Sequence, residues 1–234
     1  MTQQLVITGA SSGIGQAVAS HFLQEGWSVI NIARRPCPIT GVANLLCDLS
    51  LPGAVEALRA PLGSHLDQAG TLCLVHNAGL METDRINKLP DANLRSALEL
   101  TILSASALNQ IVIPWMAPGS SILYIGSTLA EKAVAGVASY VIAKHALVGM
   151  MRATCQDLAG EGIHTCMICP GFTDTPPLRA LIAAHPQILE GIKDLSAFNR
   201  LIEPEEIAAT LAFAATSPVL NGAVIHANLG QRER

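Results

Sequence analysis

The sequence predicts an α/β fold: a doubly wound sheet of about seven parallel strands flanked by helices, in a single domain covering residues 1–234. Along the chain, short β-branched runs alternate with longer segments that have helical spacing of apolar residues. This alternation is typical of βαβ units, which build parallel sheets. Length agrees, because 234 residues suffice for one such domain with a large core and are few for two enzymatic domains.

Composition supports the same fold, since 50% of the residues are apolar and 14% are charged, as in parallel sheets buried on both faces. Strands are expected at Gln4–Thr8, Trp27–Ile32, Asn44–Cys47, Thr71–His76, Ser121–Ile125, Ile163–Ile168 and Ala223–Ala227. Helices are expected at Ile14–Gln24, Gly53–Ala60, Ala92–Trp115, Ser139–Ala159 and Glu205–Ala215. Ligands of such sheets bind at the carboxyl ends of the strands.

One segment departs from this regularity, at residues 175–200. It has helical spacing interrupted by Pro186 and Gly191, and it lies between the sixth strand and the last long helix. Its position predicts a lid over the active site. The alternative is a surface helix pair that does not move.

Charge, cysteine usage and the N-terminus limit the class of protein. The net charge is −4 and the basic residues are dispersed, which argues against nucleic acid or an anionic membrane as partner. No run reaches about 18 uninterrupted apolar residues, and no secretion signal follows Met1, so a cytoplasmic location is expected. The six cysteines then read as reduced thiols. Cys166 and Cys169 should point to opposite faces of a strand, so no metal site is predicted.

A glycine-rich turn, Thr8-Gly-Ala-Ser-Ser-Gly-Ile-Gly15, joins the first strand to the first helix. Glycines at Gly9, Gly13 and Gly15 allow a tight turn and close backbone approach to a diphosphate, and the helix N-terminus offers free N–H groups. The residues between them, Ser11, Ser12 and Ile14, belong to the same predicted cofactor site. The spacing differs from the commonest dinucleotide fingerprint, and a purely structural turn is the alternative.

The end of the second strand indicates which cofactor is used. NAD-dependent enzymes of this kind usually place a carboxylate there, whereas this chain has Ala33 followed by Arg34 and Arg35. Guanidinium groups bind the 2′-phosphate of NADP by paired hydrogen bonds. NADP is therefore the predicted cofactor, against the alternative that both arginines are simply solvated.

Tyr140 and Lys144 are four residues apart on a predicted helix, so their side chains share a face. A nearby ammonium group stabilises a phenolate and lowers the pKa of a phenol from about 10 towards neutrality. The pair therefore predicts proton transfer by Tyr140 near pH 7.

Together these motifs resemble the short-chain dehydrogenase/reductase family, whose fold is Rossmann-like. His76-Asn-Ala-Gly79, Ser127 upstream of Tyr140-Val-Ile-Ala-Lys144, and Pro170-Gly-Phe-Thr-Asp-Thr175 complete the resemblance over nearly the whole chain. It implies that Tyr140 is the general acid, that Lys144 holds the nicotinamide ribose, and that Ser127 hydrogen-bonds the substrate oxygen. It further implies cofactor contacts from Asp48, Asn77, Ala78, Gly79, Pro170, Gly171, Thr173 and Thr175.

Two positions depart from the family pattern. Thr101 stands where members usually carry a catalytic asparagine that supports a water between the lysine and solvent, so its hydroxyl is the candidate for that relay. His76 replaces a more usual asparagine, and a structural role is expected for it.

The resulting prediction is an NADPH-dependent reductase of a ketone or aldehyde, reversible as an alcohol dehydrogenase. One alternative is a 3-oxoacyl-acyl carrier protein reductase. Another is a non-catalytic NADP-binding sensor or regulator. The resemblance implies a small-molecule carbonyl or alcohol substrate and a homodimer or homotetramer, because the equivalents of the helices at 92–115 and 139–159 pack between subunits in the family.

Overall fold

The computed structural model describes residues 2–67 and 70–232 and contains one seven-stranded sheet. Every strand pair is parallel, in the order β3-β2-β1-β4-β5-β6-β7. The strands are β1 (Gln3–Thr8), β2 (Ser28–Ala33), β3 (Val42–Leu46), β4 (Thr71–His76), β5 (Ser121–Ile125), β6 (His164–Pro170) and β7 (Ala223–Ala227). The order reverses direction at β1 and β4, so the predicted doubly wound parallel sheet is confirmed, and the switch point lies between these two strands.

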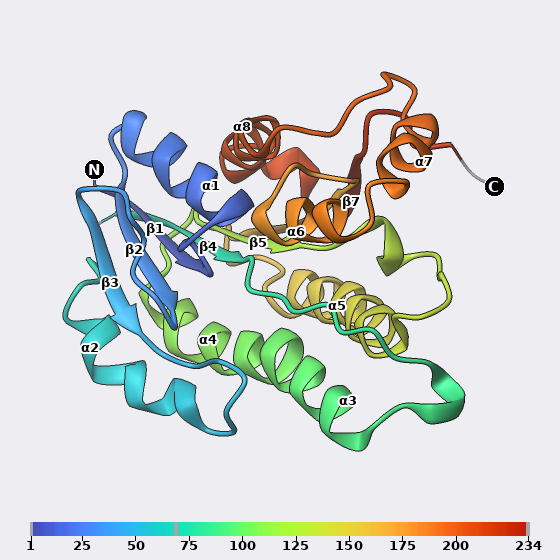
Figure 1. Cartoon of the computed structure of the whole chain (residues 1–234). Coiled ribbons are helices and arrows are strands. Elements are labelled where there is room, and N and C mark those ends of the chain that lie inside the picture. Colours follow the sequence, from blue (N-terminus) through green and yellow to red (C-terminus); the bar gives the residue numbers. More distant parts are fainter. Residues whose placement is uncertain (1, 68–69, 233–234) are drawn as a thin grey trace.

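Helices cover both faces of the sheet (Figure 1). They are α1 (Gly13–Gln24), α2 (Arg59–Gly63), α3 (Asp91–Leu98), α4 (Ser104–Val112), α5 (Ala138–Asp157), α6 (Pro176–Ala184), α7 (Ile188–Leu195) and α8 (Pro204–Ala215). One core lies between the sheet and the helices α1 and α8, and a second lies between the sheet and α2, α4 and α5. Among the described residues, none of α6 or α7 belongs to either core.

The strand sequences are apolar because each strand contributes to both cores. In β5, Leu123 and Ile125 belong to the α1–α8 core, whereas Ile122 and Tyr124 belong to the α4–α5 core. Cys166 and Cys169 of β6 divide in the same way, which confirms that they point to opposite faces.

The helix predicted at 92–115 is not a regular α-helix throughout. Between α3 and α4, residues Glu99–Leu103 form a π-helical turn. The N–H of Ser104 bonds to the carbonyl of Glu99, and the Ser104 hydroxyl donates to the bypassed carbonyl of Leu100 at 2.6 Å. A serine that satisfies the skipped carbonyl makes this wider turn stable, and such turns are frequent at functional sites.

The run Asp91–Trp115 is long and apolar enough, by length and composition alone, to cross a membrane, although it contains no uninterrupted apolar span. Of its most apolar window, 44% is buried inside the protein. Leu108, Ile111 and Val112 of this run pack in the α4–α5 core. The run is thus a core helix of the domain.

The predicted segment 175–200 folds as the helix pair α6 and α7. The break between them falls at residues 185–187, as the position of Pro186 predicts. The expectation that Gly191 also interrupts the segment is wrong, because Gly191 lies inside α7. α6 has no buried residue, and α7 buries only Ile192.

Candidate active site

The glycine-rich turn lies at the switch point between β1 and β4, where it leads into α1. Gly9 has φ 76°, a value that favours glycine. A Cβ atom at Gly15 would lie 2.4 Å from the Gly9 carbonyl oxygen and 2.5 Å from Asn77 Nδ2. Ser12 begins α1, and its side chain makes no capping hydrogen bond with the helix. Together with the half-buried Ser11, Gly13 and Ile14, the turn forms a glycine cradle at the N-terminus of α1, where helix N–H groups can bind a diphosphate.

Thr8 at the end of β1 and Asn77, which follows β4, hold this turn in place. Asn77 Nδ2 donates to the carbonyls of Thr8 and Gly9 at 2.9 and 3.1 Å. The Thr8 hydroxyl accepts the N–H groups of Asn77 and Ala78, each at 2.9 Å. The amide of Asn77 therefore fixes the turn, and Ala78 and Gly79 continue from it along the edge of the cradle.

Asn31 is a further support of the turn that sequence reasoning missed. It is fully buried in β2, where Oδ1 accepts the N–H of Ala10 at 2.9 Å and Nδ2 donates to Asn44 Oδ1 at 2.9 Å. The Asn44 oxygen also accepts the N–H of Cys37 at 2.8 Å. A lone amide within the apolar run Val29–Ile32 was the available signal, because buried amides need partners.

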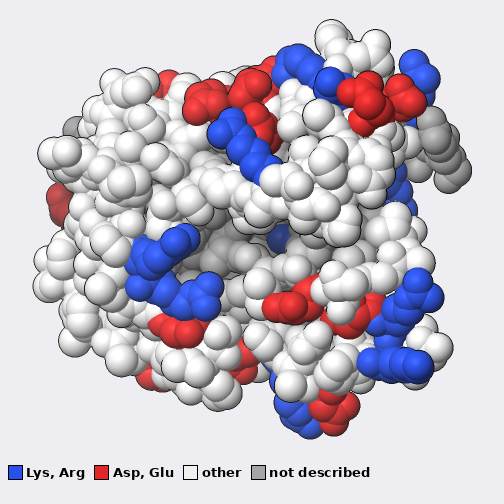
Figure 2. Space-filling model, viewed as in Figure 1, with Lys and Arg blue, Asp and Glu red and all other residues white. Residues whose placement is uncertain are grey.

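The predicted adenine-side residues lie at the ends of β2 and β3. Arg34 and Arg35 are exposed, and Figure 2 shows basic side chains on one wall of the central hollow. Asp48 is half-buried and accepts from Ser50 N and Oγ at 3.0 and 2.6 Å. These hydrogen bonds, with a smaller contribution from Arg34, lower the pKa of the Asp48 carboxyl.

Ser127 and Tyr140 meet beside the end of β6. The Ser127 side chain lies near enough to the Tyr140 phenol to oppose a rise in its pKa, and the Ser127 hydroxyl accepts the N–H of Leu129 at 3.1 Å. Cys169 is fully buried nearby, and the backbone of Ser127 partly opposes the rise that burial causes in the pKa of the Cys169 thiol. A Cβ atom at Gly126 would lie 2.7 Å from that sulfur, so Gly126 permits the close approach.

Lys144 lies one turn further along α5 and is buried. Its Nζ donates to the Ile125 carbonyl at 2.7 Å and lies 5.5 Å from the centre of the Tyr140 ring. A Cβ atom at Gly79 would lie 3.8 Å from Nζ. The catalytic lysine predicted from the sequence therefore reaches the edge of the glycine cradle, and the predicted triad of Ser127, Tyr140 and Lys144 is brought together.

The protonation of this site differs from the sequence expectation. Burial raises the pKa of Tyr140, and the Ser127 side chain only partly opposes this effect. Burial also lowers the pKa of Lys144 to about 8. Burial of the phenol therefore opposes the lowered pKa expected for Tyr140, while the Lys144 Nζ donates to the Ile125 carbonyl.

Thr101 is buried in the π-helical turn, which packs against α5. His145, the residue after Lys144, is exposed and bonds the Val141 carbonyl at 2.9 Å, so it lies outside the site.

His76 begins a buried chain of hydrogen bonds behind the site. Its Nε2 bonds Asn109 Oδ1 at 2.8 Å, Asn109 Nδ2 donates to the Tyr124 hydroxyl at 2.9 Å, and that hydroxyl meets Thr154 Oγ1 at 3.1 Å. Because an amide oxygen only accepts, His76 Nε2 carries the proton. Burial lowers the pKa of His76 to about 4, so its ring is neutral at pH 7. The predicted structural role of His76 agrees with this arrangement.

The stretch after β6 passes over the same edge of the sheet. Pro170 ends β6 and Gly171 follows it, with Asn228 so close that a Cβ at Gly171 would lie 3.0 Å from its Cα. Thr173 is buried, and its hydroxyl donates to the Gly171 carbonyl at 3.1 Å. Thr175 precedes α6 and approaches the glycine turn, since a Cβ at Gly13 would lie 3.2 Å from its methyl carbon.

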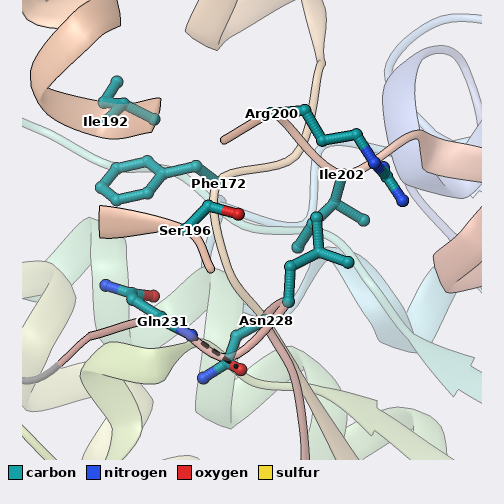
Figure 3. A pocket seen from close by; sticks show the side chains of 8 residues that line it. Phe172, Ile192, Ser196, Arg200, Ile202, Asn228 and Gln231 are labelled. Carbon is teal, nitrogen blue, oxygen red and sulfur yellow. Dashed lines mark hydrogen bonds between the residues drawn. The ribbon is translucent and has the colours of Figure 1, made fainter. Parts of the chain in front are cut away.

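A small cavity lies where α7 meets the C-terminal segment (Figure 3). Ile192 and Phe172 face it from one side, and Asn228 and Gln231 from the other. Backbone hydrogen bonds join the two segments, from Ala197 to Leu229 at 3.1 Å and from Arg232 to Leu195 at 2.7 Å. The C-terminal segment therefore holds the end of α7.

A larger hollow, of about 430 Å³, lies beside Ser127. Its lining is polar and consists of Thr128, Glu131, Lys132, His226 and Asn228. His226 Nε2 and Glu131 Oε2 are 2.7 Å apart across it. His226, which is brought in from β7, was not among the residues predicted from the sequence.

Comparison with known proteins agrees with this geometry. A family model described as "Enoyl-(Acyl carrier protein) reductase" matches residues 9–231. The chain is 30% identical over 240 residues to a 3-oxoacyl-[acyl-carrier-protein] reductase of Pseudomonas aeruginosa, with 96% of this chain and 95% of the relative covered.

Solved structures show the same fold. A short-chain dehydrogenase/reductase from Serratia marcescens superposes with a TM-score of 0.86 at 26% identity, with 97% of each chain covered. A 3-oxoacyl (acyl-carrier-protein) reductase from Agrobacterium tumefaciens, solved with NADP bound, gives a TM-score of 0.88 at 23% identity over 97% of this chain and 93% of that one.

This chain belongs to the short-chain dehydrogenase/reductase family. It is an oxidoreductase of that family, whose members use NAD(P) and act on small molecules.

Proposed function

We propose that this protein is an NADP(H)-dependent reductase that converts a ketone or aldehyde to an alcohol, reversibly. The observation that carries the proposal is the meeting of Ser127, Tyr140 and Lys144 beside the glycine cradle. The turn suits a dinucleotide because its glycines allow tight packing behind it, where a Cβ atom at Gly15 would lie 2.4 Å from the Gly9 carbonyl oxygen and one at Gly9 would lie 3.1 Å from Asn77 Nδ2.

Each residue of the triad has a distinct task. A bound nicotinamide would supply the hydride to the carbonyl carbon. Ser127 orients the carbonyl oxygen by a hydrogen bond, and Tyr140 donates the phenolic proton to that oxygen as the alcohol forms. Lys144, as a cation, stabilises the phenolate that remains until it takes a proton from solvent.

The choice of NADP rests on the end of β2. Ala33 offers no carboxylate to ribose hydroxyls, and the exposed Arg34 and Arg35 are available to a 2′-phosphate. Arg34→Ala should lower NADPH affinity about tenfold or more and leave NADH affinity nearly unchanged, because a charge-assisted contact is lost. Arg59→Ala, another exposed arginine, is the control. Equal affinities for the two cofactors in the unmodified protein would contradict the assignment.

For substrate we favour a small ketone or aldehyde. The relatives named as 3-oxoacyl-[acyl-carrier-protein] reductases support an acyl thioester as the alternative substrate. An acidic carrier protein would need a basic docking surface, but Arg179 and Arg200 of the segment 175–200 are paired with Asp174 and Glu206. A screen of NADPH oxidation against ketones, aldehydes, quinones and acyl thioesters distinguishes these classes.

The proton path beyond Lys144 is assigned to the π-helical turn. We infer that the Thr101 hydroxyl and a water take the place of the family's asparagine. Thr101→Val should slow turnover with little change in NADPH affinity, because the shape is kept and the hydroxyl is lost. Unchanged turnover would refute this relay and leave the role of Tyr140 intact.

The remaining assignments concern setting and assembly. Residues 175–200 act as a lid over the bound substrate. The protein is a cytoplasmic homodimer or homotetramer whose contact surfaces are the helical run 91–115 and α5, where Leu103 and Ile142 are exposed. Sedimentation equilibrium tests the assembly directly, and a monomer at micromolar concentration would contradict it.

Replacing the phenol tests the proposed function. Tyr140→Phe should keep NADPH binding and lower turnover by about 100-fold or more, because only the proton donor is removed. Tyr124→Phe is a matched control, since it removes the other phenol of the chain from the buried core. Binding of NADPH with no turnover of any carbonyl by the unmodified protein would favour the non-catalytic sensor instead.

A further inference from the structure

Helix α5 carries both Tyr140 and Lys144, yet it has no N-cap of its own. The residue at its N-cap position is Val137, which offers no side-chain hydrogen bond. The first N–H groups of a helix need acceptors, and an apolar residue at this position cannot supply one. Ser139 is the second residue of α5, and Tyr140 follows it directly.

The missing cap comes from a distant part of the chain. Asp84 lies in the loop after β4, and this loop runs along α5 before it reaches α3 (Figure 1). Asp84 Oδ1 accepts the N–H of Ser139 at 3.0 Å, and Oδ2 accepts the Ser139 hydroxyl at 2.5 Å. These residues are 55 positions apart in sequence.

The backbone of Asp84 is fixed to the same place. Its N–H donates to the Gly136 carbonyl at 2.9 Å, and its carbonyl accepts the N–H of Ala138 at 3.4 Å. Asp84 pairs with Val137 as an isolated parallel bridge. The carboxylate is only 6% exposed and Ser139 only 1%, so water does not compete for these bonds.

The charge state of Asp84 is consistent with a cap. Burial disfavours its ionised form, but the hydrogen bonds from Ser139, with others from Asn93 and Ala138, outweigh burial and lower the pKa of Asp84. A carboxylate is also favoured at the positive end of the helix dipole.

We propose that Asp84 is a positioning residue for catalysis, which holds the first turn of α5 so that the Tyr140 phenol meets Ser127 and the substrate carbonyl. The inference rests on the proposed function. Asp84 touches no reacting atom and acts through Ser139, the neighbour of Tyr140. The loop that carries Asp84 begins at Gly79, beside Lys144 Nζ, so the same segment bounds the cofactor cradle and fixes the catalytic helix.

Substitutions at Asp84 provide the first test. Asp84→Ala should lower kcat about 10- to 100-fold, because small misplacements of a reacting group cost this much, with NADPH affinity changed less than about threefold. Asp84→Asn should stay within about threefold of the unmodified rate, because its amide can accept from the Ser139 N–H and donate to the Ser139 hydroxyl. Ser139→Ala should fall between the two, and it remains usable should Asp84→Ala fail to fold.

A double substitution separates positioning from a general structural defect. In the Tyr140→Phe background, adding Asp84→Ala should change the residual rate less than about twofold, because the group that Asp84 positions is already gone. A general defect would instead multiply the two losses. Asn221→Ala is the control, since it removes a side-chain acceptor of a backbone N–H at the amino end of β6, away from the site.

The outcomes are distinct from those of the proposed function. Full activity in Tyr140→Phe would contradict the proposed function itself. Loss of turnover in Tyr140→Phe with a nearly unchanged kcat in Asp84→Ala would overturn this inference alone. It would also be overturned if Asp84→Asn lowered the rate as much as Asp84→Ala.

Discussion

The turn after β1 and the segment after β6 border the same edge of the sheet, yet the structure holds them in different ways. The glycine turn is tied by buried side chains, with Asn31 bonding Ala10 and Asn77 bonding Thr8 and Gly9. The segment 175–200 buries one residue in its two helices, Ile192. Segments with few buried contacts open at low free-energy cost.

This difference has a functional reading. A dinucleotide is the same for every substrate, so a preformed cradle loses little conformational freedom on binding. A lid must open for substrate and product, so it is built with few buried contacts and is held at its ends. Two backbone hydrogen bonds hold these ends. The Asp174 N–H donates to the Ile202 carbonyl at 2.8 Å, and the Arg232 N–H donates to the Leu195 carbonyl at 2.7 Å.

The largest effect is expected from a methyl group in the glycine turn. Gly15→Ala places a Cβ 2.4 Å from the Gly9 carbonyl oxygen, so the turn must shift. The free energy of unfolding should fall by about 1 to 3 kcal/mol, and NADPH affinity should fall about tenfold or more. Denaturant unfolding and fluorescence titration measure both. A variant with normal affinity would mean that the turn adapts easily, against the comparison.

Lys144→Met should abolish most turnover and raise stability at pH 7. The folded-state pKa of about 8 lies below the ordinary 10.5, so the unfolded chain binds the proton more tightly between these values. Above pH 10.5 Lys144 is neutral in both states and costs no stability. As the pH falls through 8 the buried side chain takes up a proton, and the protein loses stability. Removing the buried charge should therefore gain about 1 to 3 kcal/mol at pH 7, and the gain should shrink above pH 8. Lower stability of the variant at pH 7 would contradict this reading.

His76→Gln tests the chain of hydrogen bonds behind the cradle. The pKa of His76 is lowered from 6.5 to about 4, so stability is full above pH 6.5 and is lost as pH falls towards 4. Glutamine can still donate to Asn109 but does not titrate. Between pH 6.5 and 4, the free energy of unfolding of the variant should therefore fall by up to about 3 kcal/mol less than that of the unmodified protein. Parallel acid-unfolding curves for the two proteins would show that His76 does not govern this range.

The smallest effect is expected in α7, where a substitution of glycine by alanine causes no steric clash. A Cβ at Gly191 has no atom within 4 Å. Gly191→Ala should leave NADPH affinity unchanged and stabilise the protein by up to about 1 kcal/mol, the difference in helix propensity. Destabilisation by more than this amount would mean that α7 is packed as tightly as the turn.

Much of the fold could be predicted because it depends on short-range patterns. The ranges of β4, β5 and β7 agree with the prediction at both ends, since each is a short run between polar or glycine residues. The π-helical turn could not be predicted from periodicity, because it depends on the single hydroxyl of Ser104. The division of 175–200 at Pro186 was readable, whereas Gly191 was misread because a helix tolerates one exposed glycine.

The candidate site shows the same limit. The grouping of Ser127, Tyr140 and Lys144 followed from sequence motifs, but their supports did not. Asn31 bonds a residue 21 positions away and Asp84 one 55 positions away, and only the folded chain brings such pairs together. The pKa of Tyr140 was also mispredicted, because burial and the direction of the Lys144 ammonium depend on the whole site.

Hydrogen exchange read by mass spectrometry tests the central comparison most directly. Without NADPH, the backbone amides of Gly9 and Ala10, which donate to the Ile32 carbonyl and Asn31 Oδ1, should exchange at least about 100-fold more slowly than those of 176–195, because they are released only when the core of the sheet opens. Addition of NADPH and a substrate analogue should then slow exchange in 176–195 and leave these two amides unchanged. Slow exchange in 176–195 without any ligand, or rapid exchange at Gly9 and Ala10, would contradict the account of a preformed cradle beside a movable lid.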